Sequence, residues 1–542
     1  MKTHKDRIMK KTLTAAVCAA LAISASAQNV SDALRYSQND YYGTARSIAM
    51  GNAFTALGGD IGSVQINPAG SAVNNYSQFS ITPSLNILVG TADYSGDGNV
   101  DTGSLSTTRN SRNRLTMPGI GAITNYKTNR ASGLRSISFG LVGNATAYYN
   151  DRMTAEGLND QTSYMGYLSA ISSYDGLTIS ELNGTRYCDM NPFYWPAMVG
   201  YRCGMVNPAG DGNYISPVEG VYGSGYMLNG TLEQAYSRRS KGSKYDMLFN
   251  LGANFDNWLY LGANIGIIDI DYSFDSYIRE SALNTSDFPV TIEGIKTYFD
   301  NMRFHQAYSA TGTGIYMKVG VIAVPAPGLR IGAAIQTPVA NYITERLWFS
   351  GDTEFGDGFR GSETIYDDED YIYTYKLRSP YRFNAGVAYT IPGVGLISAD
   401  YEMCDYSTMK FREVEWKAGD SFKESNRSIR DGAGVSNMIR IGAEFTPTSS
   451  IALRAGYNLT TTPDRYLDSA GNKIAPDATK HAVSFGLGYK SAGSFFCDAA
   501  VRCSILPYEY VYPYDSYDDL VSPEICVTAN LWNAALTFGW RF

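Results

Sequence analysis

Apolar and polar residues alternate with a period of two along most of the chain after residue 75. In the first such segment, Phe79, Ile81, Leu85, Ile87 and Val89 share one face, and the opposite positions are mostly polar. Because successive side chains of a β-strand point to opposite faces, this pattern predicts strands with one apolar and one polar face. We predict fourteen strands, at about 76–90, 114–127, 134–149, 243–255, 258–278, 308–324, 328–346, 371–390, 395–411, 434–447, 450–462, 479–490, 493–510 and 523–542.

The connections between these strands alternate strictly between long and short. Short turns follow the even-numbered strands, as at 325–327 and 448–449, and long loops follow the odd-numbered ones. Transmembrane β-barrels have short periplasmic turns and long extracellular loops, whereas a soluble β-sandwich has no reason to alternate in this way. The sequence therefore predicts an all-β fold, a 14-stranded antiparallel transmembrane β-barrel over residues 76–542.

Both ends of the chain agree with this location. Residues 1–27 combine a basic start, a short apolar run and Ala25-Ser26-Ala27, which together predict a cleavable signal peptide. No later stretch of 18 or more apolar residues could form a membrane-spanning helix. The last strand ends at Phe542 with aromatic residues on one face, as a closing barrel strand requires. We expect a protein of the Gram-negative outer membrane that is inserted by the barrel-assembly machinery and contacts membrane lipid and lipopolysaccharide.

Composition and charge exclude several other functions. The formal net charge is −8, which argues against nucleic acid as a partner. Beyond the predicted signal peptide the chain keeps two histidines, His305 and His481, and neither stands in a motif with a nucleophile. The cysteines have no metal-ligand spacing. We therefore expect no enzymatic activity, no cofactor and no metal.

A barrel of this size needs a filling for its lumen. Barrel width grows with strand number, and fourteen strands enclose more space than their own side chains fill. Residues 28–75 precede the first strand and lack the two-residue alternation. They are predicted to form a hatch, or plug, inside the barrel.

The hatch contains the most specific string in the chain, GTARSIAMGNAFTALGGDIGSVQINPAG, from Gly43 to Gly70. It resembles the N-terminal hatch of the FadL/TodX family of outer-membrane transport proteins. The residues that match the motif of that hatch are Arg46, Gly51, Asp60, Asn67, Pro68, Ala69 and Gly70. The strings at 311–338 and 377–389 are also similar to barrel strands of the family. The large insertion at about 150–242 is not covered by the resemblance.

The resemblance implies passive transport of hydrophobic small molecules, either long-chain fatty acids or aromatic compounds. Extracellular loops would capture the ligand, which would then leave sideways through the barrel wall at the third strand. Pro118 cannot donate to a β-ladder, and glycines inside strands mark bends. The candidate lateral opening is therefore the seam between the second and third strands, and it comprises Pro118, Gly119, Gly140, Gly143 and Asn144.

The loop at about 150–242 is rich in aromatic and apolar residues. One interpretation is a capture surface for a hydrophobic ligand, with Phe193, Tyr194, Trp195 and Met198 as candidates. The alternative is that these residues form the loop's own small core, and the two interpretations are compatible. Cys188 and Cys203 lie in this loop and could form a disulfide in an oxidising compartment.

A second function would use the same fold. A FadL-type barrel could serve as a protein-interaction subunit, resembling the PorV-like component of type IX secretion, with its external loops holding exported protein domains. The hatch string fits both functions, so the sequence leaves the choice open.

Overall fold

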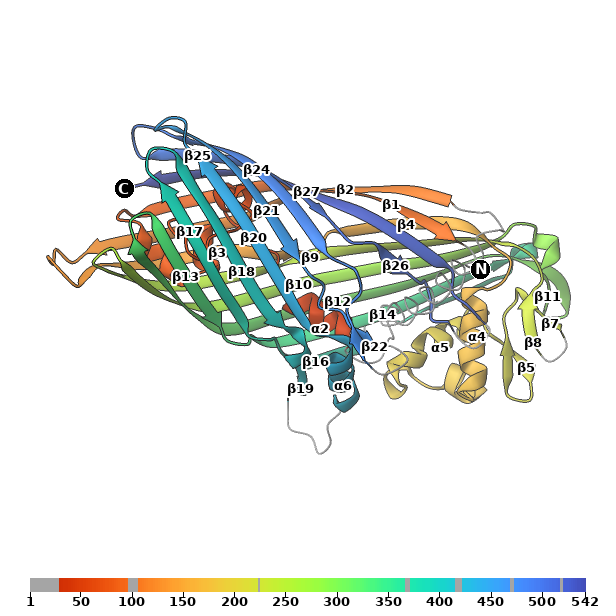
Figure 1. Cartoon of the computed structure of the whole chain (residues 1–542). Helices are drawn as coiled ribbons and strands as arrows, with labels where there is room; N and C mark the ends of the chain where they lie inside the picture. The colour runs from red at the N-terminus through yellow and green to blue at the C-terminus, as the bar shows by residue number, and fades with distance from the viewer. Residues whose placement is uncertain are drawn as a thin grey trace.

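The computed structural model describes residues 29–95, 106–222, 225–365, 371–414, 422–467, 472–516 and 520–542. The predicted signal peptide at 1–27 lies outside the described residues. The chain forms a closed, antiparallel 14-strand barrel (Figure 1). The last strand pairs with the first from Gln78↔Arg541 to Ser95↔Glu524, which closes the wall. The predicted fold class and the positions of the fourteen strands are confirmed.

Eleven of the fourteen wall strands are each one uninterrupted strand where they cross the membrane. Around the barrel these are β1 (Gln78–Ser95), β2 (Ser106–Lys127), β3 (Leu134–Tyr148), β9 (Leu232–Phe255), β10 (Leu259–Ala282), β12 (Ile295–Ala326), β20 (Val435–Phe445), β21 (Ile451–Thr460), β24 (Lys480–Lys490), β25 (Phe495–Ile505) and β27 (Glu524–Arg541).

Three neighbouring strands are interrupted at one level. They consist of β13 (Leu329–Gln336) with β14 (Ala340–Phe355), β16 (Tyr371–Arg378) with β17 (Arg382–Ile391), and β18 (Gly395–Asp405) with β19 (Lys410–Glu413). The segments nearer the short turns pair with each other, as β13 does with β17. The segments nearer the long loops also pair with each other, as β14 does with β16. A proline beside the breaks, Pro338 or Pro380, removes a ladder donor at each of the first two.

Several strands extend further on the loop side than their pattern predicted. β9 begins at Leu232 rather than 243, and β12 begins at Ile295 rather than 308. The outward positions of these extensions are mostly polar or charged, as at Glu233, Arg239 and Lys241 on β9 and Asp300 and Arg303 on β12, so they lack the apolar-out alternation that marks the membrane band. The wall therefore continues well beyond the apolar zone on the side of the long loops.

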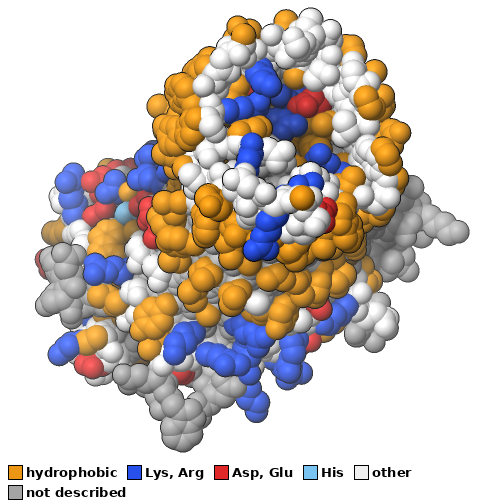
Figure 2. Space-filling view, turned by 90° about the vertical axis from the view of Figure 1, so that its left-hand side faces the viewer, with side chains coloured by type: hydrophobic (Ala, Val, Ile, Leu, Met, Phe, Trp, Pro, Cys, Tyr) orange, Lys and Arg blue, Asp and Glu red, His pale blue; other side chains and the backbone are white. Residues whose placement is uncertain are grey.

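An apolar band surrounds the barrel near the end with the short turns. Its exposed side chains include Leu115, Phe139, Met247, Phe249, Ile265, Met317, Ile331, Val387, Ile441, Phe485, Leu536 and Trp540. Figure 2 views the molecule from this end and shows apolar side chains around the outer wall, with charged groups inside the mouth. An outward apolar band on a closed barrel of even strand number is the architecture of bacterial outer-membrane proteins. The chain is therefore a barrel of the Gram-negative outer membrane.

Residues 29–75 lie inside this barrel. They form two short α-helices, α2 (Val30–Ser37) and α3 (Ala45–Ala49), and two 3₁₀ helices, η1 (Gly62–Gln65) and η2 (Pro68–Val73). Their side chains are mostly buried. None of the described helices is long and apolar enough to cross a membrane.

A belt of inward-facing glycines makes room for this segment. At each of these positions a Cβ atom would come within about 3.1 Å of a hatch atom. The belt consists of Gly119, Gly121, Gly252, Gly262, Gly320, Gly332, Gly386, Gly442, Gly456 and Gly486. Several of them are direct neighbours across the sheet, such as Gly252 and Gly262, or Gly442 and Gly456. The hatch backbone thus rests directly on the strand backbones.

The insertion after β3 forms an extracellular cap. β4 (Asp151–Asn159) and the start of β9 continue the wall as a paired ladder. Between them lie α4 (Tyr164–Tyr174), α5 (Trp195–Arg202), short helical turns (Ser180–Gly184, Tyr187–Asp189, Pro192–Tyr194) and two hairpins, β5–β6 (Asn207–Gly210, Asn213–Ile215) and β7–β8 (Glu219–Tyr222, Gly225–Leu228). The loop predicted at 150–242 is therefore shorter than expected, because both of its ends are strands.

Three smaller lobes complete the loop end. They contain a 3₁₀ turn at Thr285–Asp287 with β11 (Pro289–Ile292), a 3₁₀ turn at Gly356–Gly358 with β15 (Arg360–Thr364), and a 3₁₀ turn at Tyr406–Thr408 with α6 (Lys423–Gly432). Short pairs β22 (Tyr466–Leu467) and β23 (Lys473–Ile474), and β26 (Glu509–Val511) beside β27, lie in the last two loops.

The glycine belt gives a first prediction. In Gly456→Ala, the new Cβ atom would lie 2.1 Å from the backbone nitrogen of Gly51 and 2.4 Å from the carbonyl carbon of Met50. Because backbone atoms cannot swing aside, we expect the free energy of unfolding to fall by about 1–3 kcal/mol. Thermal unfolding of the detergent-solubilised barrel measures this change.

Gly143→Ala is the matched control, because the nearest atom to its Cβ is 3.6 Å away, on the side chain of Ile120. Equal melting temperatures for the two variants would contradict the tight fit between hatch and wall.

Candidate functional site

A cavity of about 470 Å³ lies between the hatch and the extracellular cap. Arg35 and Asp40 of the hatch line it on one side, and Tyr164, Leu168 and Phe193 of the cap line it on another. Inward side chains of β10, β12 and several other wall strands, together with residues 506–515, also contribute to the lining. Its volume falls in the range of known small-molecule sites, roughly 300–1,000 Å³.

The lining is rich in aromatic rings. It contains Tyr148, Tyr149, Tyr164, Tyr167, Tyr236, Tyr272, Tyr512, Tyr514, Phe193, Phe274, Phe304 and Phe349. Several of these rings pack against one another: Tyr149 lies edge to face on Tyr272 with ring centroids 5.1 Å apart, and Tyr164 lies tilted against Phe304 at 5.0 Å. Rings that brace one another in this way present a preorganised apolar surface whose few hydroxyl groups can fix the orientation of a ligand.

Each basic residue of the lining is held by a carboxylate. Lys480 Nζ lies 2.7 Å from Asp40 Oδ2, and Arg35 pairs with Asp32. Arg238 bonds to two acids, with Nε 2.8 Å from Asp151 Oδ2 and Nη2 2.6 Å from Glu509 Oε2. A ligand therefore meets neutralised ion pairs rather than an uncompensated positive charge.

The cap has its own hydrophobic core, which continues into the barrel extension. The indole of Trp195 is 1% exposed, and its Nε1 donates to the carbonyl oxygen of Met190. Met198 is fully buried in the same core. Of the four candidate capture residues, Phe193 lines the cavity, Tyr194 packs beside it, and Trp195 and Met198 support the cap from within. Trp195 and Met198 are buried in the cap core and are not among the residues that line the cavity, so a role for them in capture stays a prediction.

The predicted disulfide is not formed. Cys188 is exposed beside Arg186, whereas Cys203 is buried next to Thr353 of the barrel extension, and both are free thiols. Cys203 belongs to the cap core, and Cys188 lies on a surface turn outside it. Packing, not a covalent bond, holds this part of the cap.

Glu280 joins the cap to the barrel. It lies on β10 beyond the apolar band, is fully buried, and accepts hydrogen bonds from the backbone nitrogen of Tyr164 at 2.6 Å and from Gln234 Nε2 at 2.7 Å. Tyr164 begins helix α4, so the carboxyl group sits at the positive end of the helix. Burial nevertheless dominates and raises the pKa of Glu280 from 4.5 to about 8.

The hatch motif residues serve to fix the hatch. Arg46 forms a salt bridge with Glu444 of β20, with Nε and Oε2 2.9 Å apart. Asp60 accepts hydrogen bonds from Thr44 Oγ1 at 2.7 Å and from the backbone of Gly62 at 2.8 Å. Both residues therefore tie the hatch fold together or to the wall.

The Asn67–Gly70 part of the motif acts at the wall as well. Asn67 Nδ2 donates to the carbonyl oxygens of Thr55 at 2.6 Å and Val321 at 3.1 Å, while Oδ1 caps the turn that contains Pro68, Ala69 and Gly70. In Gly51, φ is +61°, and its nitrogen lies against Gly456. These contacts explain why this string requires small residues and one amide.

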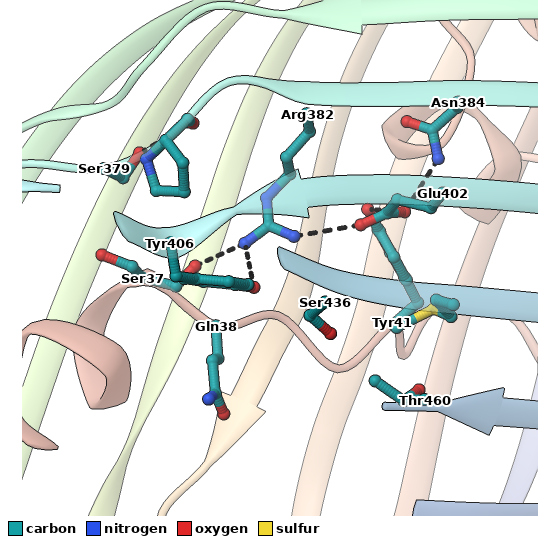
Figure 3. Close-up of polar contacts among 12 residues, drawn as sticks. Ser37, Gln38, Tyr41, Ser379, Arg382, Asn384, Glu402, Tyr406, Ser436 and Thr460 are labelled. Carbon is teal, nitrogen blue, oxygen red and sulfur yellow. Dashed lines mark hydrogen bonds and ion pairs between the residues drawn. The ribbon is translucent and has the colours of Figure 1, made fainter. Parts of the chain in front are cut away.

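A buried polar cluster anchors the last residue of α2 and the chain that follows it (Figure 3). Arg382 donates from Nη1 to Glu402 at 3.0 Å and from Nη2 to Tyr406 at 3.2 Å and to the carbonyl oxygen of Ser37. Glu402 also accepts from Tyr41, Asn384 and Arg440, at 2.7, 2.8 and 3.2 Å. Buried charges are tolerated when they are paired and hydrogen-bonded in this way.

The seam between β2 and β3 lacks backbone hydrogen bonds along much of its length. Backbone pairing runs from Lys127↔Ser136 to Gly119↔Asn144. Above that level the described part of β2, from Ser106 to Pro118, pairs with β1, and β4 pairs with β9. No β2–β4 ladder joins them among the described residues.

The predicted seam residues lie at the lower end of this gap. Pro118 is in a bulge of the β1–β2 ladder, opposite the register shift between Thr82 and Ser84. Gly119 faces Gly43 of the hatch, and Asn144 is buried against Gly62. Gly140 and Gly143 lie in the paired part of β3, and the bulge in that strand comes just after them, between Ala145 and Ala147.

Side chains bridge the gap in place of a ladder. Asn110 exchanges two hydrogen bonds with the backbone of Thr154, at 3.0 and 3.2 Å. Lower down, the hydroxyl groups of Tyr148 and Tyr245 lie 3.1 Å apart, and Tyr245 donates to the carbonyl oxygen of Met117. Tyr148 also lines the cavity and packs on Tyr42 of the hatch, with ring centroids 4.9 Å apart. Tyr148 thus stands between the cavity and the gap in the wall.

No group of three or more potential metal ligands occurs among the described residues. His305 stacks on Tyr277 with ring centroids 4.0 Å apart, and His481 bonds to the hydroxyl group of Tyr457 at 2.7 Å. Neither histidine is among the residues that line the cavity.

Sequence reasoning missed the lining from β10 and from residues 506–515. A signal was present in β10, because its apolar residues change faces at Ile267 and Ile268. Below that point Leu261, Ile265 and Ile267 face outward, and above it Ile270, Tyr272, Phe274 and Ile278 are buried inside. Such a change of phase marks the level at which the lumen becomes apolar.

No protein-family model matches this chain, and no curated protein matches it either. Among solved structures, it is similar to a FadL homologue of Pseudomonas aeruginosa, with 11% identity, coverage of 93% of this chain and 99% of that one, and a TM-score of 0.48. It is also similar to the Pseudomonas putida toluene transporter TodX, with 13% identity, 93% and 99% coverage and a TM-score of 0.45. A third is the CymD monoaromatic hydrocarbon channel, with 9% identity, the same coverage and a TM-score of 0.44.

Glu280 gives a prediction about pH. Its pKa is higher in the docked cap, at about 8, than the ordinary 4.5, so docking takes up a proton. Stabilisation of the docked cap should therefore be complete below about pH 4.5 and decline as the pH rises towards 8. We expect limited proteolysis of the cap to accelerate across that window.

Glu280→Gln should remove most of this pH dependence, because the amide oxygen can still accept from Tyr164. Glu233→Gln, on the exposed face of neighbouring β9, is the control and should leave the profile unchanged. A pH profile that is the same in all three proteins would rule out a role for Glu280.

Proposed function

We propose that this protein is a passive outer-membrane channel for hydrophobic small molecules, captured under the extracellular cap and released sideways through the β2–β3 seam. The observation that carries the proposal is Tyr148, which lines the aromatic cavity and also occupies the gap in the wall. A cavity whose side wall is closed by side chains can open by rotamer changes, without breaking a β-ladder. Such rotamer changes are fast on the timescale of transport.

The hatch supports lateral rather than axial release. It fills the lumen below the cavity and is fixed by buried salt bridges such as Arg46–Glu444 and by direct contact with the glycine belt. Moving it would break many polar contacts in a region that water cannot readily reach. An apolar ligand also gains by leaving into lipid, at about 25 cal/mol per Å² of apolar surface kept from water.

The lining favours uncharged aromatic compounds over long-chain fatty acids. A fatty acid would bring a carboxylate next to Asp40, Asp151 and Glu509, which already satisfy the basic residues of the cavity. Burying an additional unpaired charge is costly. An uncharged ring with one polar group could instead stack on the tyrosines and bond to a hydroxyl group.

The cellular setting completes the proposal. The outward apolar band would contact membrane lipid, and the charged extensions above it would lie among lipopolysaccharide head groups. The terminal strand β27, with Trp540 and Phe542 exposed, suits recognition by the barrel-assembly machinery.

A second candidate function, a protein-interaction subunit of a secretion system, is favoured by one observation. The β7–β8 hairpin of the cap exposes Val221, Tyr222 and Met227, at 69%, 54% and 58%, and Leu283 nearby is 59% exposed. Exposed apolar groups at an extracellular tip suit a protein partner. Co-purification of a stoichiometric protein with a cavity that binds no small molecule would favour this function.

The cavity gives a prediction about binding. Phe193→Asp places a carboxylate in the lining, and we expect the affinity for a monoaromatic compound to fall at least about tenfold, because roughly 1.5–3 kcal/mol of apolar burial is lost. Isothermal titration with the purified protein, using toluene and a long-chain fatty acid in parallel, measures the change and the preference.

Ile179→Asp is the control, because Ile179 is 51% exposed and is not among the residues that line the cavity. Equal affinity in both variants would exclude the cavity as the binding site. Tighter binding of the fatty acid than of toluene would refute the ligand class.

The seam gives a prediction about transport. In the double variant Asn110→Cys/Thr154→Cys, a disulfide would join β2 to β4 across the gap. We expect oxidised cells to lose most uptake of a radiolabelled monoaromatic compound and to regain it on reduction, because a covalent bridge cannot swing aside as the side chain of Asn110 can.

Thr91→Cys/Thr528→Cys is the matched control, since these residues are direct neighbours in the paired β1–β27 ladder, with hydroxyl oxygens 2.8 Å apart. Full uptake with the Asn110–Thr154 pair oxidised would show that ligand leaves by another route.

A further inference from the structure

Four arginines gather at the seam just above the apolar band. Arg112 and Arg114 start on the cavity-facing side of β2, opposite Leu88 and Asn86, and reach across the gap to backbone carbonyls of β4 and β9. Arg152 and Arg239 are exposed on β4 and β9 on its other side. Arg152 and Arg239 are directly opposite each other in the β4–β9 ladder. Like charges at directly opposed positions destabilise a sheet, so this arrangement needs a compensating interaction.

The positive charges act on one another. Arg112 lies near the positive charges of Arg239, Arg114 and Arg152, and near the negative charge of Asp151. Arg112 donates to the carbonyl oxygens of Asp151, at 2.8 Å, and Ser240, and Arg114 donates to that of Gly242 at 2.7 Å. These bonds are to neutral oxygens, which do not cancel a charge.

Two carboxylates, those of Asp151 and Asp275, lie close to the cluster in the strand register. Asp151 accepts from Arg238 at 2.8 Å, whereas Asp275 lies directly opposite Arg239 on β10, 3.5 Å from the imidazole of His305, and offsets part of the charge of Arg239. No salt bridge joins any of the four arginines to a carboxylate within the described part of the chain. The four arginines outnumber these carboxylates, so the cluster carries a net positive charge.

The cluster lies at the depth of lipid head groups. On β2 the outward residues just below it are Leu115 and Met117, which are 78% and 40% exposed, and on β9 the first exposed apolar residue below it is Met247, at 52%. The cap and the long loops lie on the other side. This is the outer edge of the membrane band, on the extracellular face.

We propose that Arg152 and Arg239, together with the guanidinium group of Arg112 in the gap beside them, bind a phosphate-bearing head group of an outer-leaflet lipid on the outer face of the seam. Guanidinium groups match phosphate oxygens in forked pairs of charge-assisted hydrogen bonds. A phosphate placed between β4 and β2 would neutralise the repulsion between Arg152 and Arg239. It would also bridge two strands that lack a ladder, while the acyl chains of the lipid lie along the apolar band below.

Arg152→Gln/Arg239→Gln tests the proposal, because both side chains are exposed and neither is used to close the seam. Native mass spectrometry of the detergent-solubilised barrel would measure binding of bis-phosphorylated lipid A, of the same lipid after enzymatic dephosphorylation, and of inorganic phosphate. We expect one tightly bound bis-phosphorylated lipid on the native protein, with at least about tenfold weaker binding to the variant, since two charge-assisted contacts are lost.

Arg303→Gln/Arg360→Gln is the control, because it removes the same charge from exposed arginines that pair with Asp352 and Glu354. It should bind lipid like the native protein, and heat-modifiable mobility in gels should show that every variant is folded. Equal binding by both double variants would overturn the proposal, as would equal binding of the dephosphorylated lipid. Saturable binding of inorganic phosphate as tight as that of the lipid would also overturn it, in favour of a site for the free ion.

Discussion

The lumen of a fourteen-stranded barrel is too wide for its own side chains to fill, and the hatch fills its lower part. The solution has two parts that work together. Inward glycines such as Gly320 and Gly456 let the hatch backbone lie on the wall, and buried ion pairs such as Arg46–Glu444 and Arg382–Glu402 fix its position. Without the glycines the hatch would not fit, and without matched charges its polar contacts would cost more than they stabilise.

Once the lower lumen is filled, the remaining space lies above it, and the cap encloses that space. The strands rise beyond the membrane, their inward faces become aromatic, and the cap core containing Trp195 rests on them. Glu280 is one of the polar contacts at this junction, where its carboxyl group accepts from the first backbone nitrogen of α4. The inward face of the wall thus differs between its two ends: glycines contact the hatch near the short turns, and aromatic side chains line the cavity under the cap.

The wall is continuous below and interrupted above, and the interruption has a local cause. Pro118 and the bulge in β3 end the β2–β3 ladder, and β4 then pairs with β9 instead. Side chains occupy the gap, namely tyrosines at the cavity level and arginines at the membrane surface. The seam is therefore the part of the barrel whose closure depends on side chains that a ligand or a lipid can influence.

The sequence by itself determined the barrel, because a two-residue alternation and alternating loop lengths follow directly from strand geometry and from a membrane on one side of the wall. It also pointed to Pro118, which lies at a bulge of the β1–β2 ladder because proline cannot donate to the ladder, whereas Gly140 and Gly143 lie in the paired part of β3. It did not determine which aromatic residues line the cavity: Phe193 and Trp195 are two positions apart, yet one lines the cavity and the other is buried in the cap core. Nor could it show that Cys188 and Cys203 stay apart, or that Arg112, Arg152 and Arg239 converge. Those outcomes depend on contacts between segments far apart in the chain, which only the tertiary structure brings together.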